Sequence, residues 1–196
     1  MALIASIPPK KAADAVNTTF LDFNKNRTFK SPSLRNATGD LQLTEPHQVF
    51  TLGLSDLVNG KGLDAAKPTG WRYFVQQGDN VLASAQSGIA GSSGEHVFSA
   101  FSESRFVASS ADAIRAAKEF PEVKQGGFEL RLLSVPGLYV EVLWLHDPQG
   151  KNDILIPLAP SPLELQLGSQ VSVATLLKEL VSKAKGPIEA ADLTGG

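Results

Sequence analysis

The sequence predicts an α+β protein, with a mainly antiparallel sheet built from hairpins and two or three helices packed on one face. Three observations lead to this fold class. Short apolar segments of strand length are separated by turns rich in glycine, proline and asparagine. An amphipathic helical stripe lies near the end of the chain. The strands follow one another without the strict strand–helix alternation of parallel α/β folds, so hairpins dominate.

Composition predicts one globular domain with two extensions. The 196 residues are 42% hydrophobic and 19% charged, which provides enough apolar material for one core and excludes global disorder. We expect an extended polar N-terminal arm at 1–45, a single α+β core domain at 46–186 and a flexible C-terminal tail at 187–196. The arm is predicted because its apolar residues are scattered without a sustained period. Its six basic residues between Lys10 and Arg35 are too dispersed for a nucleic-acid footprint.

Charge and cysteine content exclude several classes of protein. The formal net charge is −2, so no overall field attracts nucleic acid or an anionic membrane, and we expect neither as a partner. The chain has no cysteine, which excludes disulfides, zinc ribbons, iron–sulfur clusters and thiol nucleophiles. No apolar run approaches the roughly 18 residues of a membrane-spanning helix, and no secretory signal is recognisable. The expected location is therefore cytoplasmic.

The first elements of the core are a strand, a short helix and a hairpin. Residues 48–54 form an apolar stretch of strand length, and Ser55-Asp56 then offers a cap for a short helix. Residues 71–75 are rich in aromatic side chains, and Trp71, Tyr73 and Val75 share one face by the two-residue period of a strand. A polar turn at 76–80 connects this segment to a second apolar segment at 81–85, which predicts a hairpin.

A glycine- and serine-rich loop at 88–94, a strand at 97–101 and a helix follow. Ser109 and Asp112 have the spacing of a capping box, in which each side chain satisfies a free backbone donor at the helix start. Apolar residues recur at helical spacing after it, and Pro121 prevents the helix from continuing much further.

The strongest sheet signal comes next and leads into the final helix. Apolar and charged residues alternate at 128–132, 138–146 is almost entirely apolar, and a third short strand is predicted at 153–157. The segment 172–185 has apolar residues at the i, i+3, i+4, i+7 spacing and is a helix that should end at Gly186-Pro187.

The length of the turn after Val135 determines which way Glu141 points. An even-length turn would place Glu141 on the core face with Leu132, and burying an unpaired carboxylate costs several kcal/mol. An odd-length turn would place Glu141 near Arg131 on the other face, where a cross-strand ion pair is weakly favourable. We therefore expect the odd turn.

Four residues are candidates for catalysis. His146 ends the apolar strand beside Asp147, and a histidine there could act as a general base with a carboxylate assisting. His96 follows Glu95 after the glycine-rich loop, whose backbone donors could meet an anion. The more conservative interpretation makes Asp147 the initiator of an Asp-Pro turn and the loop a flexible connection.

No cofactor or metal site is expected. The histidines lack metal-ligand spacing, and the loop spacing matches neither a P-loop nor a dinucleotide fingerprint. The absence of a chemical constellation favours a bacterial-type binding or assembly module without catalytic activity. Its predicted partner is another protein or a second copy of the chain rather than a small molecule. The alternative is a small hydrolase or lyase that acts on a polar small molecule with a histidine base.

Overall fold

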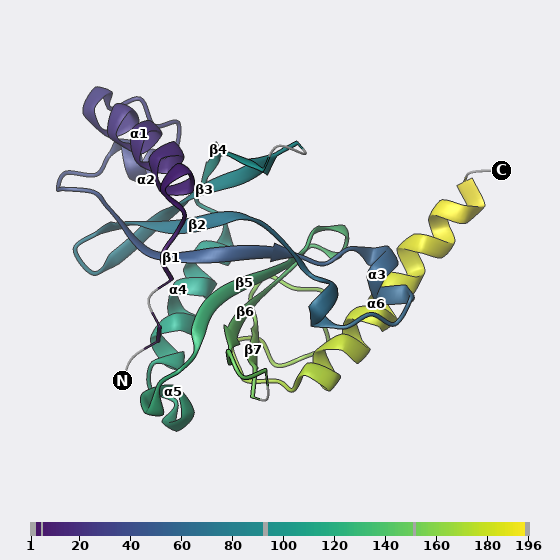
Figure 1. The fold of residues 1–196 in the computed structure, drawn as a ribbon. Coiled ribbons are helices and arrows are strands. Elements are labelled where there is room, and N and C mark those ends of the chain that lie inside the picture. The colour runs from purple at the N-terminus through teal and green to yellow at the C-terminus, as the bar shows by residue number, and fades with distance from the viewer. Residues whose placement is uncertain (1–2, 5, 92–93, 151, 195–196) are drawn as a thin grey trace.

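Seven strands form one sheet in the order β4–β3–β2–β1–β5–β6–β7 (Figure 1). All neighbouring strands pair antiparallel except β1 and β5, which are parallel, so the predicted α+β class with a mainly antiparallel sheet is confirmed. The strands are β1 Gln42–Thr51, β2 Lys67–Gln77, β3 Asn80–Ala90, β4 Glu95–Ser102, β5 Glu129–Val135, β6 Val140–His146 and β7 Ile154–Pro157. The structure is a computed structural model that describes the backbone of all residues except 1–2, 5, 92–93, 151 and 195–196, and the side chains of 187–194 are not described.

The sheet consists of two antiparallel meanders that meet at the parallel pair. Strands β1 to β4 form the first meander and β5 to β7 the second. At the junction, Gln48 to Thr51 of β1 pair with Arg131 to Ser134 of β5. At the start of β5 the neighbour is Ile4, which lies beside Glu129 and whose amide donates to the Phe128 carbonyl at 2.8 Å. The N-terminal segment therefore lies along β5 where β1 no longer pairs with it.

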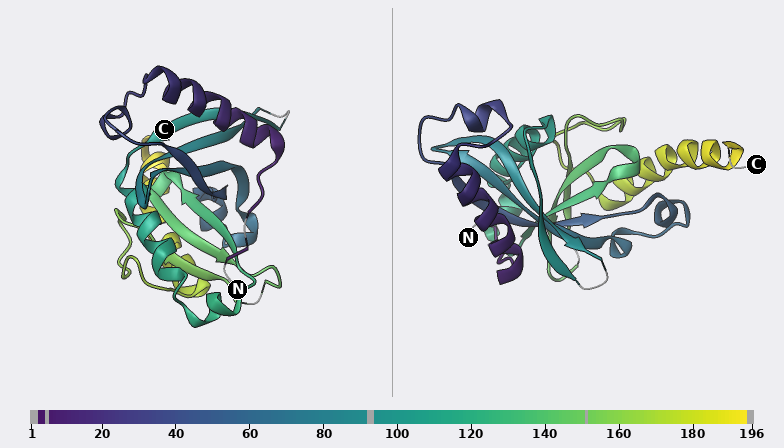
Figure 2. Two further views of the ribbon diagram at one scale, coloured as in Figure 1. Left: turned by 90° about the vertical axis from the view of Figure 1, so that its left-hand side faces the viewer. Right: turned by 90° about the horizontal axis from the view of Figure 1, so that it is seen from above.

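Helices cover both faces of the sheet, which corrects the prediction that they pack on one face (Figure 2). Leu132 and Leu143 face α4 (Arg105–Ala117) and α5 (Pro121–Gln125), and we call this side the α4 face. The opposite side, the α6 face, carries α6 (Val173–Thr194) over the second meander and α1 (Lys10–Asn26) over the first. The short helices α2 (Pro32–Arg35) and α3 (Leu54–Val58) also pack on the α6 face. A central strand such as β6 is apolar because it is covered on both sides.

The N-terminal region is not an extended arm. Helix α1 buries Ala12, Val16 and Phe20, each at most 5% exposed, as it packs against β3 and β4. These three residues share the i, i+4 spacing of one helical face. The sequence pattern does not indicate this helix, because the apolar stripe is narrow, contains small residues and is surrounded by polar ones. Residues 10–26 therefore belong to the core.

Two helix boundaries differ from those predicted. Helix α4 begins at Arg105, one turn before the expected capping box, and the Ser109 hydroxyl instead accepts from the Ala159 amide at 2.9 Å. Helix α6 continues through Gly186 and Pro187 to Thr194, so the predicted flexible tail is helical over its described part. A proline removes one helical hydrogen bond without forbidding the helix, and nothing packs within 4 Å of a side-chain position at Gly186 to divert the chain.

The predicted odd turn after Val135 is wrong. The connection to Val140 has four residues, and the register pairs Ser134 with Glu141, so Glu141 lies on the α4 face with Leu132. The carboxylate is not unpaired there, because the Arg72 guanidinium from β2 donates to both of its oxygens at 2.7 and 2.8 Å. The prediction of an odd turn assumed that Glu141 would be unpaired on the core face. It is wrong because Arg72, from a strand distant in the sequence, supplies the partner.

Candidate functional site

The four candidate catalytic residues occupy two distant places in the sheet. Glu95 and His96 begin β4, at one edge of the sheet, whereas His146 ends β6 and Asp147 follows it. Strands β3, β2, β1 and β5 lie between β4 and β6. At the usual strand spacing this separation is roughly 24 Å. The structure therefore does not bring the two pairs together.

The glycine-rich segment before Glu95 is a hairpin rather than a long loop. Strand β3 continues to Ala90, and Gly91 and Gly94 flank the turn with positive φ angles of 55° and 67°. Residues 92–93, which belong to the predicted anion-binding loop, lie outside the described residues. The Nδ1 atom of His96 is buried and has no hydrogen-bond partner among the described residues.

Asp153, rather than Asp147, is the carboxylate beside His146. The His146 Nδ1 lies 3.1 Å from Asp153 Oδ1, and the Trp144 indole nitrogen donates to Asp153 Oδ2 at 2.6 Å. The backbone amide of Asp147 donates to the same carboxylate at 2.8 Å. Three neighbours therefore share one carboxylate that is only 14% exposed. The imidazole also packs edge-on against the Trp144 ring, with centroids 5.5 Å apart.

Asp147 organises the turn between β6 and β7. Its Oδ1 accepts from the Gln149 amide at 2.9 Å, and its Oδ2 accepts from the Asn152 amide at 3.2 Å. An aspartate that binds backbone donors two and more residues ahead is typical of a turn initiator. The position of Asp147 agrees with the more conservative of the two interpretations of this residue.

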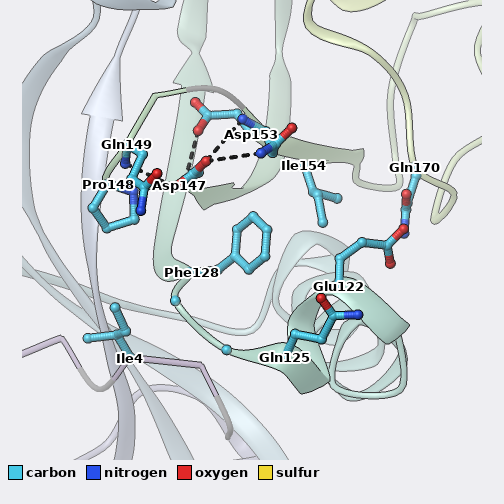
Figure 3. A pocket seen from close by; sticks show the side chains of 13 residues that line it. Ile4, Glu122, Gln125, Phe128, Asp147, Pro148, Gln149, Asp153, Ile154 and Gln170 are labelled. Carbon is cyan, nitrogen blue, oxygen red and sulfur yellow. Dashed lines mark hydrogen bonds between the residues drawn. The ribbon is translucent and has the colours of Figure 1, made fainter.

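A hollow of about 800 Å³ lies next to this turn (Figure 3). Phe128 and Ile154 form its apolar floor, and Glu122 and Gln125 of α5 stand at its rim opposite the turn. The consecutive positive φ angles of Gly126 and Gly127, 90° and 103°, turn the chain from α5 into Phe128. We call this site the acidic hollow; its described lining is Ile4, Glu122, Gln125, Gly126, Gly127, Phe128, Asp147, Pro148, Gln149, Asn152, Asp153, Ile154 and Gln170.

The charge of the acidic hollow is negative. Its described lining includes three carboxylates and four side-chain amides, and no lysine, arginine or histidine. Lys151 lies outside the described residues, and adding its single positive charge to the three carboxylates would still leave a sum of −2. Such a site repels phosphate and other anions and attracts cations. Neither His146 nor His96 is part of the lining.

The sequence offered partial signals for the acidic hollow. Asp147 is a candidate from the sequence, and the Gly126-Gly127 pair indicates a sharp turn that returns the residues before it toward the next strand. No local pattern marks Asp153, because the register of β6 and β7 brings it beside His146. Gln170 comes from a proline-containing connection whose path no local pattern specifies.

Metal and membrane sites find no support in the described part of the chain. Within it, no group of three histidine, aspartate or glutamate side chains is arranged to hold a metal ion. Among the helices described, none combines the length and the apolar character needed to cross a bilayer. No protein-family model, curated protein or solved structure matches this chain.

Proposed function

We propose that the protein is a non-catalytic binding module whose acidic hollow takes up a basic segment of a protein partner. The observation that carries the proposal is the combination of three carboxylates with an apolar floor in the same 800 Å³ hollow. Lysine and arginine side chains have an apolar stem and a charged head, so they match a site that offers Phe128 below and carboxylates at the rim. A negative lining disfavours nucleic acids and phosphorylated metabolites.

The carboxylates have different tasks in this proposal. Asp147 and Asp153 already accept backbone and side-chain donors, so they keep the turn rigid and contribute charge. Glu122 is exposed at the rim on α5 and is the side chain that meets an incoming cation directly. Because the turn is already rigid and only the Glu122 side chain must become ordered, binding loses little conformational entropy.

The test is a titration of the protein with short peptides that differ in charge. A lysine- and alanine-containing peptide should bind with an affinity that falls as salt is added, and the matching glutamate peptide should not bind. Glu122→Gln should weaken binding roughly three- to fivefold, the effect of an exposed ion pair. Glu119→Gln is the matched control, because Glu119 pairs with Lys124 and does not line the hollow.

Two results would contradict the proposal. Equal binding of the lysine and glutamate peptides would show that charge does not select the ligand. Equal loss of affinity in Glu122→Gln and Glu119→Gln would place the binding surface outside the hollow.

The contact between Asp153 and His146 favours a hydrolase or lyase as a second candidate function. A carboxylate on Nδ1 fixes the imidazole orientation, as in enzymes that use Nε2 as a general base. Against it, the carboxylate is shared with Trp144 and Asp147, and His146 does not line the acidic hollow. Binding without turnover is therefore the function that we propose first.

A further inference from the structure

The two edge strands of the sheet, β7 and β4, differ in whether another backbone segment hydrogen-bonds to their outer side. At the β7 edge, the amides of Val171 and Gly168 each donate at 2.8 Å to the carbonyls of Leu155 and Pro157. All four residues of β7 are buried. The connection that follows β7 therefore closes this edge, as native sheets commonly do to prevent pairing with another chain.

No backbone segment pairs with the outer side of β4 in this way among the described residues, although α1 packs beside β4 and Phe23 contacts Phe101. Among the described residues, the backbone hydrogen bonds that involve Glu95–Ser102 run to β3, and none of these eight residues is fully buried. Figure 1 shows β4 as the outermost strand at its end of the sheet. Val97 is 41% exposed, and Ile89 of the adjacent strand is 37% exposed.

The sequence of β4 also lacks most devices that protect an edge. Lysine, proline and inward-pointing charges usually blunt exposed strands. Between Glu95 and Ser102 there is no proline or lysine, and Glu95 is the one charged residue. A bulge is present, because Ala100 pairs with Gln86 and Phe98 with Ser87, which leaves Ser99 as the extra residue. The bulge separates the paired segment Glu95–Phe98 from Ala100–Ser102, which pairs with β3 beyond it.

We propose that β4 pairs antiparallel with β4 of a second copy of this chain, forming a two-fold symmetric dimer with a continuous sheet. The two-fold axis lies at Val97, so that Val97 meets its own counterpart and His96 lies opposite Phe98 of the other copy. An isologous contact of this kind requires a self-complementary surface. The short strand, in which Glu95 is the one charged residue, provides one, and the Ser99 bulge marks the end of the proposed paired segment.

Charge favours a second copy in this orientation. With the axis at Val97, each Glu95 lies opposite Ser99 of the other copy, and the two Glu95 residues are at opposite ends of the paired segment. Four residues of strand separate them by roughly 14 Å, which exceeds the Debye length at physiological salt. A parallel arrangement would instead place the two carboxylates side by side.

The dimer contact is independent of the proposed peptide site. The acidic hollow lies beside β6, β7 and α5, whereas β4 is the opposite edge of the sheet. Pairing through β4 leaves both hollows open at the outer ends of the dimer. Two linked sites would raise the avidity for a partner with two basic segments.

The first test measures mass in solution by size-exclusion chromatography with light scattering over a range of protein concentrations. The unmodified chain should have twice the monomer mass at high concentration and dissociate on dilution. Val97→Lys should raise the dimer dissociation constant roughly tenfold or more, because each copy would place a lysine at the axis. Val58→Lys is the matched control, since Val58 is 37% exposed on α3, away from β4. It should leave the dimer unchanged.

The second test uses the absence of cysteine in the chain. Val97→Cys should form a disulfide-linked dimer under mild oxidation, because directly opposite Cβ atoms in an antiparallel pair lie about 4.5–5.5 Å apart. Val58→Cys should give background cross-linking. The proposal is overturned if the unmodified chain is monomeric at all concentrations. It is also overturned if Val97→Lys and Val58→Lys give equal dimerisation, or if the two cysteine variants cross-link equally.

Discussion

The guanidinium of Arg72 forms a bidentate ion pair with the carboxylate of Glu141, with N–O distances of 2.7 and 2.8 Å. Arg72 lies on β2 and Glu141 on β6, so the pair spans β1 and β5 and connects the two meanders. Both side chains are largely buried, at 11% and 13% exposed. The Arg72 Nε also donates to Gln86 at 3.1 Å, which satisfies a further donor.

Breaking this pair should be costly. Arg72→Met or Glu141→Gln leaves a buried charge without its partner, and the free energy of unfolding should fall by roughly 3–5 kcal/mol in urea titrations. The double variant Arg72→Met/Glu141→Leu should recover most of that loss, because no unpaired charge remains. Arg115→Met, which removes an exposed ion pair with Asp112, is the control and should change stability by less than about 1 kcal/mol. Similar small losses for the buried and exposed pairs would argue against a role for Arg72 in joining the meanders.

His47 should make the protein less stable in acid. Its side chain is fully buried, and burial lowers its pKa from 6.5 to about 4; the Glu45 carbonyl opposes the shift and Arg72 adds to it. The unfolded chain therefore binds a proton below pH 6.5 that the folded protein does not bind until about pH 4. The contribution is complete above pH 6.5 and is lost as the pH falls to about 4, a loss of roughly 3 kcal/mol.

The measurement is the free energy of unfolding at several pH values between 4 and 7, for the unmodified chain and for His47→Gln. Carboxylates titrate in the same range in both proteins, so the difference between the two curves isolates His47. The slope attributable to the histidine should be absent in the variant. Parallel curves would show that His47 titrates alike in the folded and unfolded states.

Tyr73 should tolerate loss of its hydroxyl group. The hydroxyl is buried without a hydrogen-bond partner among the described residues, and burial raises the pKa of Tyr73 to about 12. Tyr73→Phe removes an unsatisfied polar group, so thermal and urea unfolding should show equal stability or a gain of up to about 1 kcal/mol. Tyr139→Phe, at a residue that is 65% exposed, should have no effect. A loss above about 1 kcal/mol in Tyr73→Phe would mean that the hydroxyl has a partner.

Asp153 should matter more for stability than His146. Asp153→Asn keeps the size of the side chain but replaces one acceptor oxygen with an amide nitrogen that faces the Trp144 or the Asp147 N–H donor, so stability should fall by roughly 1–3 kcal/mol. His146→Ala should cost less, because the imidazole is a partly exposed neighbour of the carboxylate. If a screen of small esters and amides detected turnover that His146→Ala abolished and His96→Ala retained, the catalytic alternative would be favoured over binding alone.

The residues that meet at the candidate site could not be predicted from the sequence. His146 and Asp147 are adjacent in the chain, which suggested that they act together, yet the pairing of β6 with β7 places Asp153 beside the imidazole. The acidic hollow joins side chains from the N-terminal segment, α5, the β6–β7 turn and the connection before α6. No local pattern states that these four segments meet.

The sequence by itself determined the elements whose signal is local. The apolar run of β6, the alternation of β5 and the stripe of α6 follow from side-chain periodicity, because burial selects apolar residues at fixed intervals along one element. Tertiary structure decided what depends on partners far away in the chain. The face of Glu141 was settled by Arg72, 69 residues earlier, and the packing of α1 by the sheet surface beneath it. In both cases, the stabilising free energy comes from contacts between residues far apart in the sequence. The spacing of apolar residues along one element does not contain that information.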